Sequence, residues 1–169
     1  MLSRRPLLTP LVTLAALALS GCSLVGSPNY DDLEPGTFSF RTRPYSSLGG
    51  GGWDQYAGAA TYHPYTEDGS PYAEAEVSLI TEQGDDIRIE SDAFLTAEVG
   101  DRFAPQAAFG PPFGGPFYTW ESGEVEITSV SVEAIGGRFR FRMRDVSIGG
   151  PFSRGTLSVE GGFLATRAE

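Results

Sequence analysis

The sequence predicts an all-β domain, which we expect to be an antiparallel β-sandwich, with a closed up-and-down barrel as the alternative. Three observations predict this class. From Thr37 onward, apolar and polar residues alternate with a period of two in short segments, which is typical of half-buried strands. Glycine, proline and aspartate separate these segments, as turns require. The longer apolar period of an amphipathic helix is not evident after Thr37.

The clearest strand is 138–144, where four arginines alternate with large apolar residues. The segment before it alternates in the same way, and Gly136-Gly137 between the two has the composition of a tight two-residue hairpin. Such a turn places Glu133 opposite Arg140 and each apolar residue opposite another apolar residue. We therefore expect a hairpin with an arginine-rich face in solvent and an apolar face in the core.

Other strands are expected at 37–43, 56–63, 74–81, 86–91, 116–121 and 155–166. The apolar phase changes near Thr128-Ser129, and a β-bulge there restores it. We expect a second bulge at Gly161-Gly162. No repeat of fixed length is apparent, which argues against a propeller or a solenoid.

Two segments are predicted to be loops. Residues 44–53 contain four consecutive glycines. Residues 103–116 are rich in glycine, proline and phenylalanine. Aromatic side chains on such a loop form a recognition surface or fold back to plug an open end of the fold, and we favour the plug.

The N-terminal residues have the three parts of an export signal. Arg4 and Arg5 form a positive region, and the apolar stretch Leu7 to Leu19 is too short to span a bilayer as a stable helix. The residues Leu-Ser-Gly-Cys at 19–22 resemble the lipobox of bacterial lipoproteins. This resemblance implies cleavage before Cys22 and attachment of acyl chains such as palmitate to that residue.

Cys22 is the only cysteine in the chain, so an internal disulfide or a cysteine-rich metal site is excluded. Each buried methylene of an acyl chain contributes about 0.8 kcal/mol, so two or three chains give a stable membrane anchor. Residues 1–21 are then the signal peptide, 22–36 the lipidated N-terminus with a flexible tether, and 37–169 a single domain.

The same N-terminal region also indicates the export route and the membrane to which the protein is anchored. Arg4-Arg5 is similar to the twin-arginine export motif, although we favour an ordinary Sec signal. Ser23 follows the cysteine where an aspartate is the usual inner-membrane retention signal of enteric bacteria. By this analogy we expect the outer membrane, with the domain facing the periplasm or the cell surface.

The mature chain is acidic and lacks lysine. The whole chain carries a formal charge of −10, and removal of the two arginines of the signal peptide leaves −12. Because phosphate contacts need cations, this charge argues against nucleic acid or anionic lipid as a partner. The absence of lysine excludes Schiff-base chemistry, a Walker-type phosphate loop and serine-lysine hydrolysis.

The residues give no indication of catalysis. His63 is the single histidine, and the chain has no G-x-S-x-G motif, so we interpret His63 as a residue at a strand end rather than a member of a triad. One histidine is also too few for a zinc site. We therefore expect no enzyme, no catalytic residue, no cofactor and no metal site.

Adjacent carboxylates occur at 31–32, 67–68 and 85–86. Their glycine-rich or tether surroundings favour turns over a glycosidase pair, and Gly84-Asp85-Asp86 is predicted to be a hairpin turn. Calcium binding near Glu67 and Asp68 stays an alternative, although the D-x-D-x-D-G spacing is missing.

The arginine face of 138–144 has two interpretations. It binds an anionic glycan or lipid headgroup, or it is the solvated side of a strand neutralised by Glu133, by Glu126 or Glu124, and by Glu160. We favour ion pairing, because it is the simpler explanation in so acidic a protein.

The C-terminal third of the mature chain carries a recurring strand pattern. It consists of Ser122-Gly123, then Val-Glu-Ile-Thr at 125–128, Gly-Arg-Phe-Arg-Phe at 137–141 and Val-Glu-Gly-Gly-Phe at 159–163. In this pattern the segment resembles uncharacterised lipoprotein families of Gram-negative bacteria. Its residues are strand and turn formers, so the resemblance implies a secreted β fold and no particular activity.

Together these features predict a non-catalytic, lipid-anchored protein that binds or scaffolds something in the bacterial cell envelope. Its expected partners are the membrane, through the lipid on Cys22, and an envelope protein or a small apolar ligand. The alternative is a carrier of a small apolar ligand resembling lipocalin-type barrels. A hydrolase is the least favoured class.

Overall fold

A computed structural model describes residues 30–44, 52–64, 75–110, 116–147 and 155–168. Two short 3₁₀ helices are present in this part of the chain, η1 (Tyr30–Asp32) and η2 (Asp92–Thr96). The strands are β1 (Thr37–Pro44), β2 (Asp54–His63), β3 (Glu76–Thr81), β4 (Asp86–Glu90), β5 (Arg102–Phe103), β6 (Gln106–Gly110), β7 (Tyr118–Val130), β8 (Ala134–Asp145) and β9 (Thr156–Arg167).

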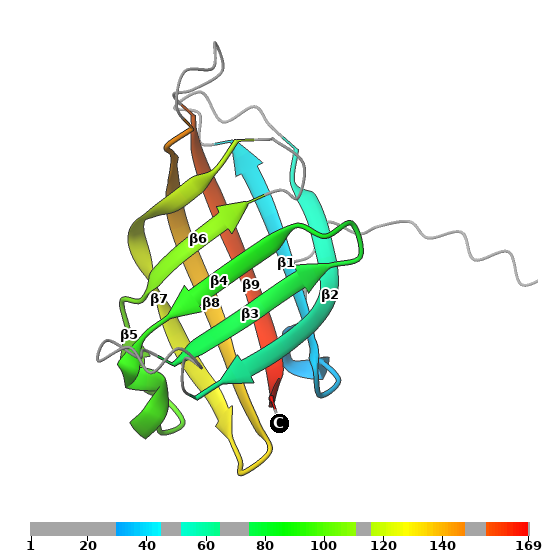
Figure 1. Ribbon diagram of the computed structural model, residues 1–169, viewed down its shortest axis with the longest axis vertical. Coiled ribbons are helices and arrows are strands. Elements are labelled where there is room, and N and C mark those ends of the chain that lie inside the picture. Colours follow the sequence, from blue (N-terminus) through cyan, green and yellow to red (C-terminus); the bar gives the residue numbers. More distant parts are fainter. Residues whose placement is uncertain (1–29, 45–51, 65–74, 111–115, 148–154, 169) are drawn as a thin grey trace, which may run out of the picture.

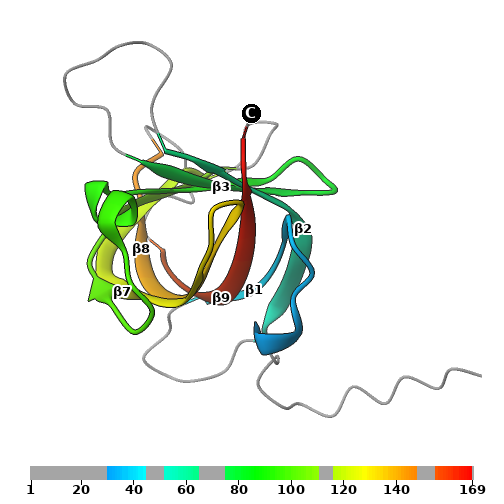
Figure 2. The ribbon, with the colours of Figure 1, turned by 90° about the horizontal axis from the view of Figure 1, so that it is seen from below.

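The strands form one closed antiparallel barrel (Figure 1). The order around the barrel is β1, β2, β3, β4, β6, β7, β8, β9, and β9 pairs with β1 from Leu164 opposite Thr37 to Leu157 opposite Pro44. The two-residue β5 pairs with β7 on the same side as β6, so the ring has eight strand positions. Figure 2 shows this ring from one end.

The predicted sandwich is therefore wrong, and the alternative, a closed up-and-down barrel, is confirmed. Alternation gives every strand one apolar face, and a sandwich and a barrel both bury such faces. The two folds differ in whether the first and last strands pair, which no local pattern encodes. Bulges between Trp120 and Ser122 and between Ile127 and Ser129 bend the long β7, and the second confirms the bulge predicted at that point.

Aromatic side chains fill the described interior. Phe40 of β1 and Phe109 of β6 lie on opposite walls, and their ring centroids are 6.1 Å apart. At the lower end in Figure 1, η2 inserts Phe94, whose ring lies 5.0 Å from that of Phe103 and 6.4 Å from that of Phe163. At both of these levels, side chains from different walls meet inside the barrel, as in a packed core.

The turn between β7 and β8 lies at 131–133, and the prediction of a turn at Gly136-Gly137 is wrong. Ser131 N donates to the Ala134 carbonyl at 2.9 Å, and Ala134 N donates to Ser131 Oγ at 2.9 Å. The glycines instead belong to β8. There they allow close packing, because a Cβ on Gly137 would lie 2.7 Å from the ring of Phe163.

The bulge predicted at Gly161-Gly162 is also wrong, because β9 pairs without interruption with both of its neighbours. Gly161 continues the inward-facing positions of β9, and a Cβ there would overlap Phe40. Gly162 faces outward, and a Cβ there would lie 2.5 Å from the Cβ of Tyr30. The pair thus admits one aromatic residue on each face of the wall.

Residues 106–110, predicted to be part of a loop, form β6 and complete the ring between β4 and β7. The segment is only five residues long and has prolines just outside it at 105 and 111, so its alternation is too short to identify. Phe103 and Phe109 do pack inward, but they do so from strands β5 and β6 and not from the predicted loop that plugs an open end. Residues 111–115 lie outside the described residues.

Candidate anion-binding surface

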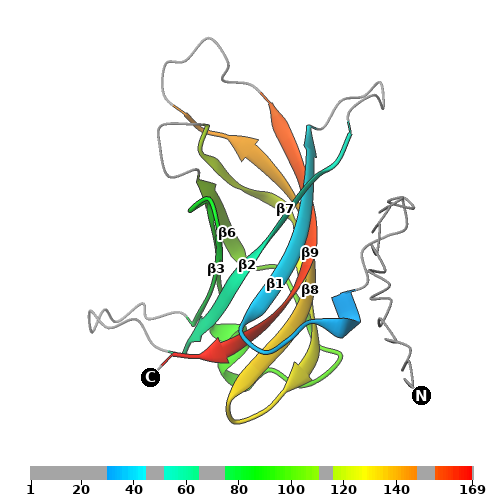
Figure 3. The same ribbon diagram turned by 90° about the vertical axis from the view of Figure 1, so that its right-hand side faces the viewer.

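The four arginines of 138–144 lie on the outer face of β8, as the alternation predicts. All four are exposed, and the apolar residues between them are buried. Two more arginines, Arg41 and Arg43, lie on the outer face of β1, and β9 runs between β1 and β8. Figure 3 shows these three strands side by side. Six arginines therefore share one wall of the barrel.

One row across this wall consists of Arg41, Glu160 and Arg140. Arg41 Nε donates to Glu160 Oε1 at 2.6 Å, and Arg140 Nε lies 3.5 Å from Glu160 Oε2. The side chains of Arg41 and Glu160 are only 12% and 17% exposed. On the other side of Arg140, β7 presents Glu124, and not Glu133 as predicted, because the hairpin turn is displaced.

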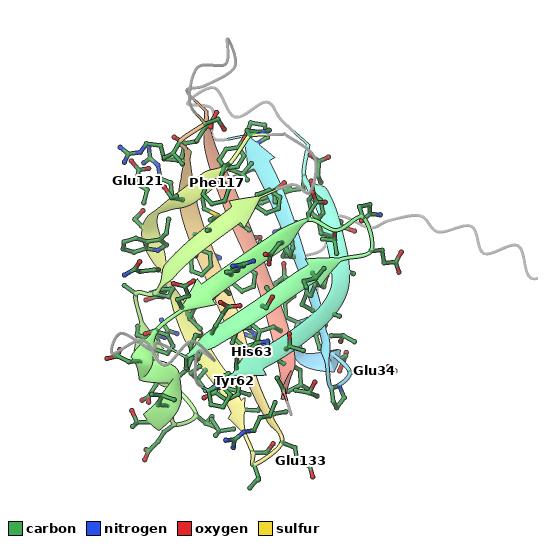
Figure 4. The ribbon with its side chains drawn as sticks, viewed as in Figure 1. Glu34, Tyr62, His63, Phe117, Glu121 and Glu133 are labelled. Atoms are coloured by element: carbon green, nitrogen blue, oxygen red, sulfur yellow. The ribbon has the colours of Figure 1, made fainter. Side chains whose placement is uncertain are left out.

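The next row consists of Arg43, Ser158 and Arg142. Arg142 Nε lies 2.9 Å from a carboxylate oxygen of Glu121, which projects beside the upper part of β7 in Figure 4. The predicted cross-strand ion pairing is thus confirmed for Arg140 with Glu160, whereas the partner of Arg142, Glu121, was not predicted. The predicted partners Glu124 and Glu126 form ion pairs with Arg102 of β5. Arg43 has no such carboxylate neighbour in its row.

An indole ring holds the two arginines of β1. The guanidinium carbons of Arg41 and Arg43 lie 4.4 and 4.5 Å from the centroid of the Trp53 ring. These are cation–π distances, which stabilise a guanidinium by about 0.5–1 kcal/mol at an exposed site. Trp53 therefore restricts both side chains without neutralising their charge.

These rows enclose a groove of 580 Å³ on the outer surface, which we call the arginine groove. Its lining includes four arginines and one carboxylate, that of Glu160. Positive charge is therefore concentrated at this groove, although the whole chain has a net charge of −10. The charged and aromatic residues that define the groove are Arg41, Arg43, Trp53, Arg140, Arg142 and Glu160.

The arginine groove has the chemistry of a binding site for anions. Guanidinium groups present planar pairs of N–H donors that match phosphate and carboxylate oxygens. Ser122 and Ser158 add hydroxyls, but the described lining contains no histidine to activate them. The arrangement can hold an anion between its guanidinium groups.

A second groove of 920 Å³ adjoins the first and shares Arg140 and Glu160 with it. Its lining is balanced in charge, since three arginines face three glutamates. Tyr30 of η1 forms part of its wall, and the Tyr30 hydroxyl donates to the Glu160 carbonyl at 3.2 Å. Burial, together with the Glu160 charge, raises the pKa of Tyr30 to about 12.

The two ends of the barrel differ. At the lower end η2 buries its own Phe94, and the Tyr62 hydroxyl donates to the Phe94 carbonyl at 3.3 Å. Toward the other end of the barrel, three aromatic side chains pack against the core but stay partly exposed: Tyr56, Tyr118 and Trp120. Burial and the charge of the nearby Asp145 raise the pKa of Tyr118. Trp120 Nε1 is buried and has no hydrogen-bond partner.

The other residues singled out from the sequence do not come together as a site. His63 is half-buried at the end of β2 opposite Glu76, near Tyr62 in Figure 4. Burial raises the pKa of Glu76, and the neighbouring Arg88 opposes this shift. Across the described ranges, no group of three or more histidine, cysteine or acidic side chains is arranged to hold a metal ion.

The turn predicted at Gly84-Asp85-Asp86 is confirmed. Gly84 has a φ of +88°, and Asp85 N donates to Thr81 Oγ1 at 2.9 Å. Asp86 begins β4 and accepts a hydrogen bond from Arg88 Nε at 2.8 Å. Cys22 and the carboxylates at 67–68 lie outside the described residues.

Sequence reasoning missed the contribution of β1 and Trp53 to the arginine face. The alternation of Arg41 and Arg43 with Phe40 and Thr42 already places both arginines on an outer face. Their position next to β9, and hence near β8, follows only from closure of the barrel.

Comparisons with protein-family models, curated protein sequences and solved structures gave no match to this chain. In the described ranges, neither helix has the length and hydrophobicity needed to cross a membrane.

Proposed function

We propose that this protein is a lipid-anchored, non-catalytic binding protein of the bacterial cell envelope, and that the arginine groove is its binding surface for anionic groups. The observation that carries the proposal is the gathering of four guanidinium groups around one groove that contains a single carboxylate. The lipobox at 19–22 supports anchoring through Cys22. On the analogy drawn from Ser23, the anchoring membrane is the outer membrane, with the domain facing the periplasm or the cell surface.

The interior of the barrel supports the choice of the outer surface. Phe40 and Phe109 meet across one level of the barrel, and Phe94 and Phe163 meet at another. A ligand held at either level would have to displace these rings from the core. The arginine groove is open to solvent and needs no such rearrangement.

Replacement of Cys22 by Ser tests the anchor. We expect the Cys22→Ser chain to leave the membrane fraction or to stay unprocessed, because no thiol is present to accept the diacylglyceryl group. Labelling with radioactive palmitate should be lost together with membrane association. A processed Cys22→Ser chain that still fractionates with membranes would refute lipid anchoring.

Pyrophosphate titrated into the detergent-solubilised lipidated protein tests the groove. We expect saturable binding by calorimetry and a change in tryptophan fluorescence, because Trp53 contacts two of the arginines. The double substitution Arg43→Gln and Arg142→Gln should weaken binding at least tenfold. The matched control is Arg88→Gln on β4, an arginine with an exposed side chain outside the groove. Equal affinity in the double variant and the control would refute the proposal.

A carrier of a small apolar ligand is the second candidate. The unpartnered Nε1 of Trp120, a partly buried ring that packs against the core, favours it, because a buried donor without a partner costs about 1–3 kcal/mol that a ligand acceptor would recover. The fluorescent probe N-phenyl-1-naphthylamine tests it. Stoichiometric binding that Trp120→Phe weakens would support the carrier, and absence of saturable binding would remove it.

A further inference from the structure

We infer that the arginine groove faces the membrane that holds the lipid anchor, and that it contacts the phosphates of the anionic lipid headgroups. This inference rests on the proposed lipidation of Cys22 and on the groove as an anion site. It adds the identity of the partner and the orientation of the barrel. Three observations carry it: the place where the anchor's chain joins the barrel, the length of that chain, and the distribution of charge.

The chain that leads from the anchor joins the barrel on the arginine-bearing wall. Tyr30 lies on the outer face of β9, where its Cβ approaches the position that a Cβ of Gly162 would occupy. Its hydroxyl donates to the carbonyl of Glu160, the residue whose side chain binds Arg41 and Arg140. In Figure 3, η1 lies beside β9 and β8. The attachment point is therefore adjacent to the arginine groove.

The connection between anchor and barrel is short. Cys22 precedes Tyr30 by eight residues, which span at most about 26–29 Å when fully extended. A flexible chain of eight residues has a root-mean-square span of about 15 Å. The wall that carries Tyr30 is therefore held near the headgroups, while the opposite wall of β3, β4 and β6 is turned away.

The charges of the two walls differ in sign. The wall formed by β1, β9 and β8 carries the six arginines and Glu160 on its outer face. The opposite wall, nearest the viewer in Figure 1, carries on β3 and β4 the acidic residues Glu76, Asp86 and Glu90 with the single Arg88. An anionic membrane surface attracts the first wall and repels the second, within about one Debye length of 8 Å at physiological ionic strength.

The positive charge of this wall modifies the expectation, drawn from the net charge, that the protein does not bind anionic lipid. A net charge of −10 disfavours association with an anionic surface from a distance. Once the acyl chains hold the protein, only the wall next to the headgroups lies within the screening length. Each arginine near an anionic surface then strengthens the interaction roughly fivefold. The groove orients the barrel, and the lipid retains it.

The test measures orientation on vesicles directly. The lipidated protein is reconstituted into vesicles of phosphatidylethanolamine and phosphatidylglycerol, with one cysteine introduced for a fluorescent label. Acylation blocks Cys22, and no other cysteine is present, so the label has a single site. Thr156→Cys places it on the outer face of β9, and the matched Ala108→Cys places it on the outer face of β6. Both positions are half-buried. A headgroup-located spin-labelled lipid then quenches whichever label lies near the membrane.

We expect stronger quenching of the label at 156 than at 108 on anionic vesicles. The difference should shrink in 0.5 M salt, where the Debye length falls to about 4 Å, and with Arg43→Glu combined with Arg142→Glu. Equal quenching at the two positions, or stronger quenching at 108, would overturn the inference. So would quenching that is unchanged on neutral phosphatidylcholine vesicles while pyrophosphate still binds, because the groove would then serve a soluble anion. Flotation of the same samples separates these results from failure of anchoring, in which the protein would not float with the vesicles.

Discussion

Gly161 and Gly162 are neighbours in β9 that face opposite sides of the barrel wall, and alanine should destabilise the protein at position 161 but not at position 162. An inward Cβ at 161 would overlap Phe40 and would lie 2.7 Å from the Ser39 carbonyl oxygen and 2.8 Å from the Phe139 ring. The Ser39 carbonyl belongs to the backbone and the Phe139 ring is buried in the core, so neither can move aside easily. At 162 the obstacle is Tyr30 alone, in the three-residue η1.

The magnitudes follow from two opposing effects. Replacing glycine by alanine in a conformation that alanine tolerates stabilises a protein by about 0.4–1 kcal/mol through the unfolded state. Overpacking a core costs about 1–3 kcal/mol. Gly161→Ala should therefore lose about 0.5–2.5 kcal/mol, which lowers the Tm by about 2–10 °C for a domain of this size. Gly162→Ala should keep the Tm or raise it slightly, because η1 lifts away from an intact barrel.

Thermal unfolding followed by circular dichroism measures the first effect, and alkaline titration of tyrosine absorbance measures the second. Detachment of η1 should return the pKa of Tyr30 from about 12 toward its ordinary value of 10.0. A Gly161→Ala protein as stable as the parent would refute the packing argument. A loss in Gly162→Ala equal to that in Gly161→Ala would show that η1 is an integral part of the barrel.

Three other contacts can be tested by substitution. Phe94→Ala should lower the free energy of unfolding, measured in urea, by about 3–5 kcal/mol because it empties a buried aromatic site. The control Leu95→Ala, at a residue 44% exposed, should change it by no more than about 0.5 kcal/mol. Similar losses in the two variants would contradict the closure of the lower end by η2. Glu160→Gln should cost about 1.5–3 kcal/mol, because it removes the charged acceptor of the nearly buried Arg41; an unchanged urea midpoint would argue against that role. The raised pKa of Tyr30 means that its contribution to stability is complete below pH 10 and is lost as pH rises through about 12. Tyr30→Phe should therefore remove the late step of a spectrophotometric titration, and a titration unaffected by this substitution would contradict the docked position of Tyr30.

Alternation predicted most of the strands because each one needs an apolar inner face. It failed for β6, where five residues between prolines give too few alternations. It also could not choose between a sandwich and a barrel, because pairing of β1 with β9 joins residues as distant as Phe38 and Phe163. Both glycine pairs were misread for a related reason. A glycine that permits a turn and a glycine that admits a neighbouring ring look the same in the sequence.

The candidate site was predictable only in part. The arginine alternation on β8 indicated an exposed basic face, and Glu160 was correctly named among its ion-pair partners. Arg41 and Arg43 follow the same alternation on β1, but their distance from β8 along the chain conceals that the three strands form one wall. Trp53 gave no signal, because an aromatic residue after a glycine run has no preferred location.

The closure of the barrel also fixes when the arginine groove comes into existence. Its lining comes from β1, β7, β8 and β9 together with Trp53, and β9 is the last strand in the described part of the chain. Pairing two strands that lie so far apart in the sequence must overcome the entropy of closing a long loop, which makes such contacts slow to form. Until Thr156 and the residues after it have joined the sheet, Arg41 and Arg140 belong to separate edges with no Glu160 between them. The groove therefore exists only when β9 is paired with both β1 and β8, and it distinguishes the closed barrel from any form that lacks this pairing.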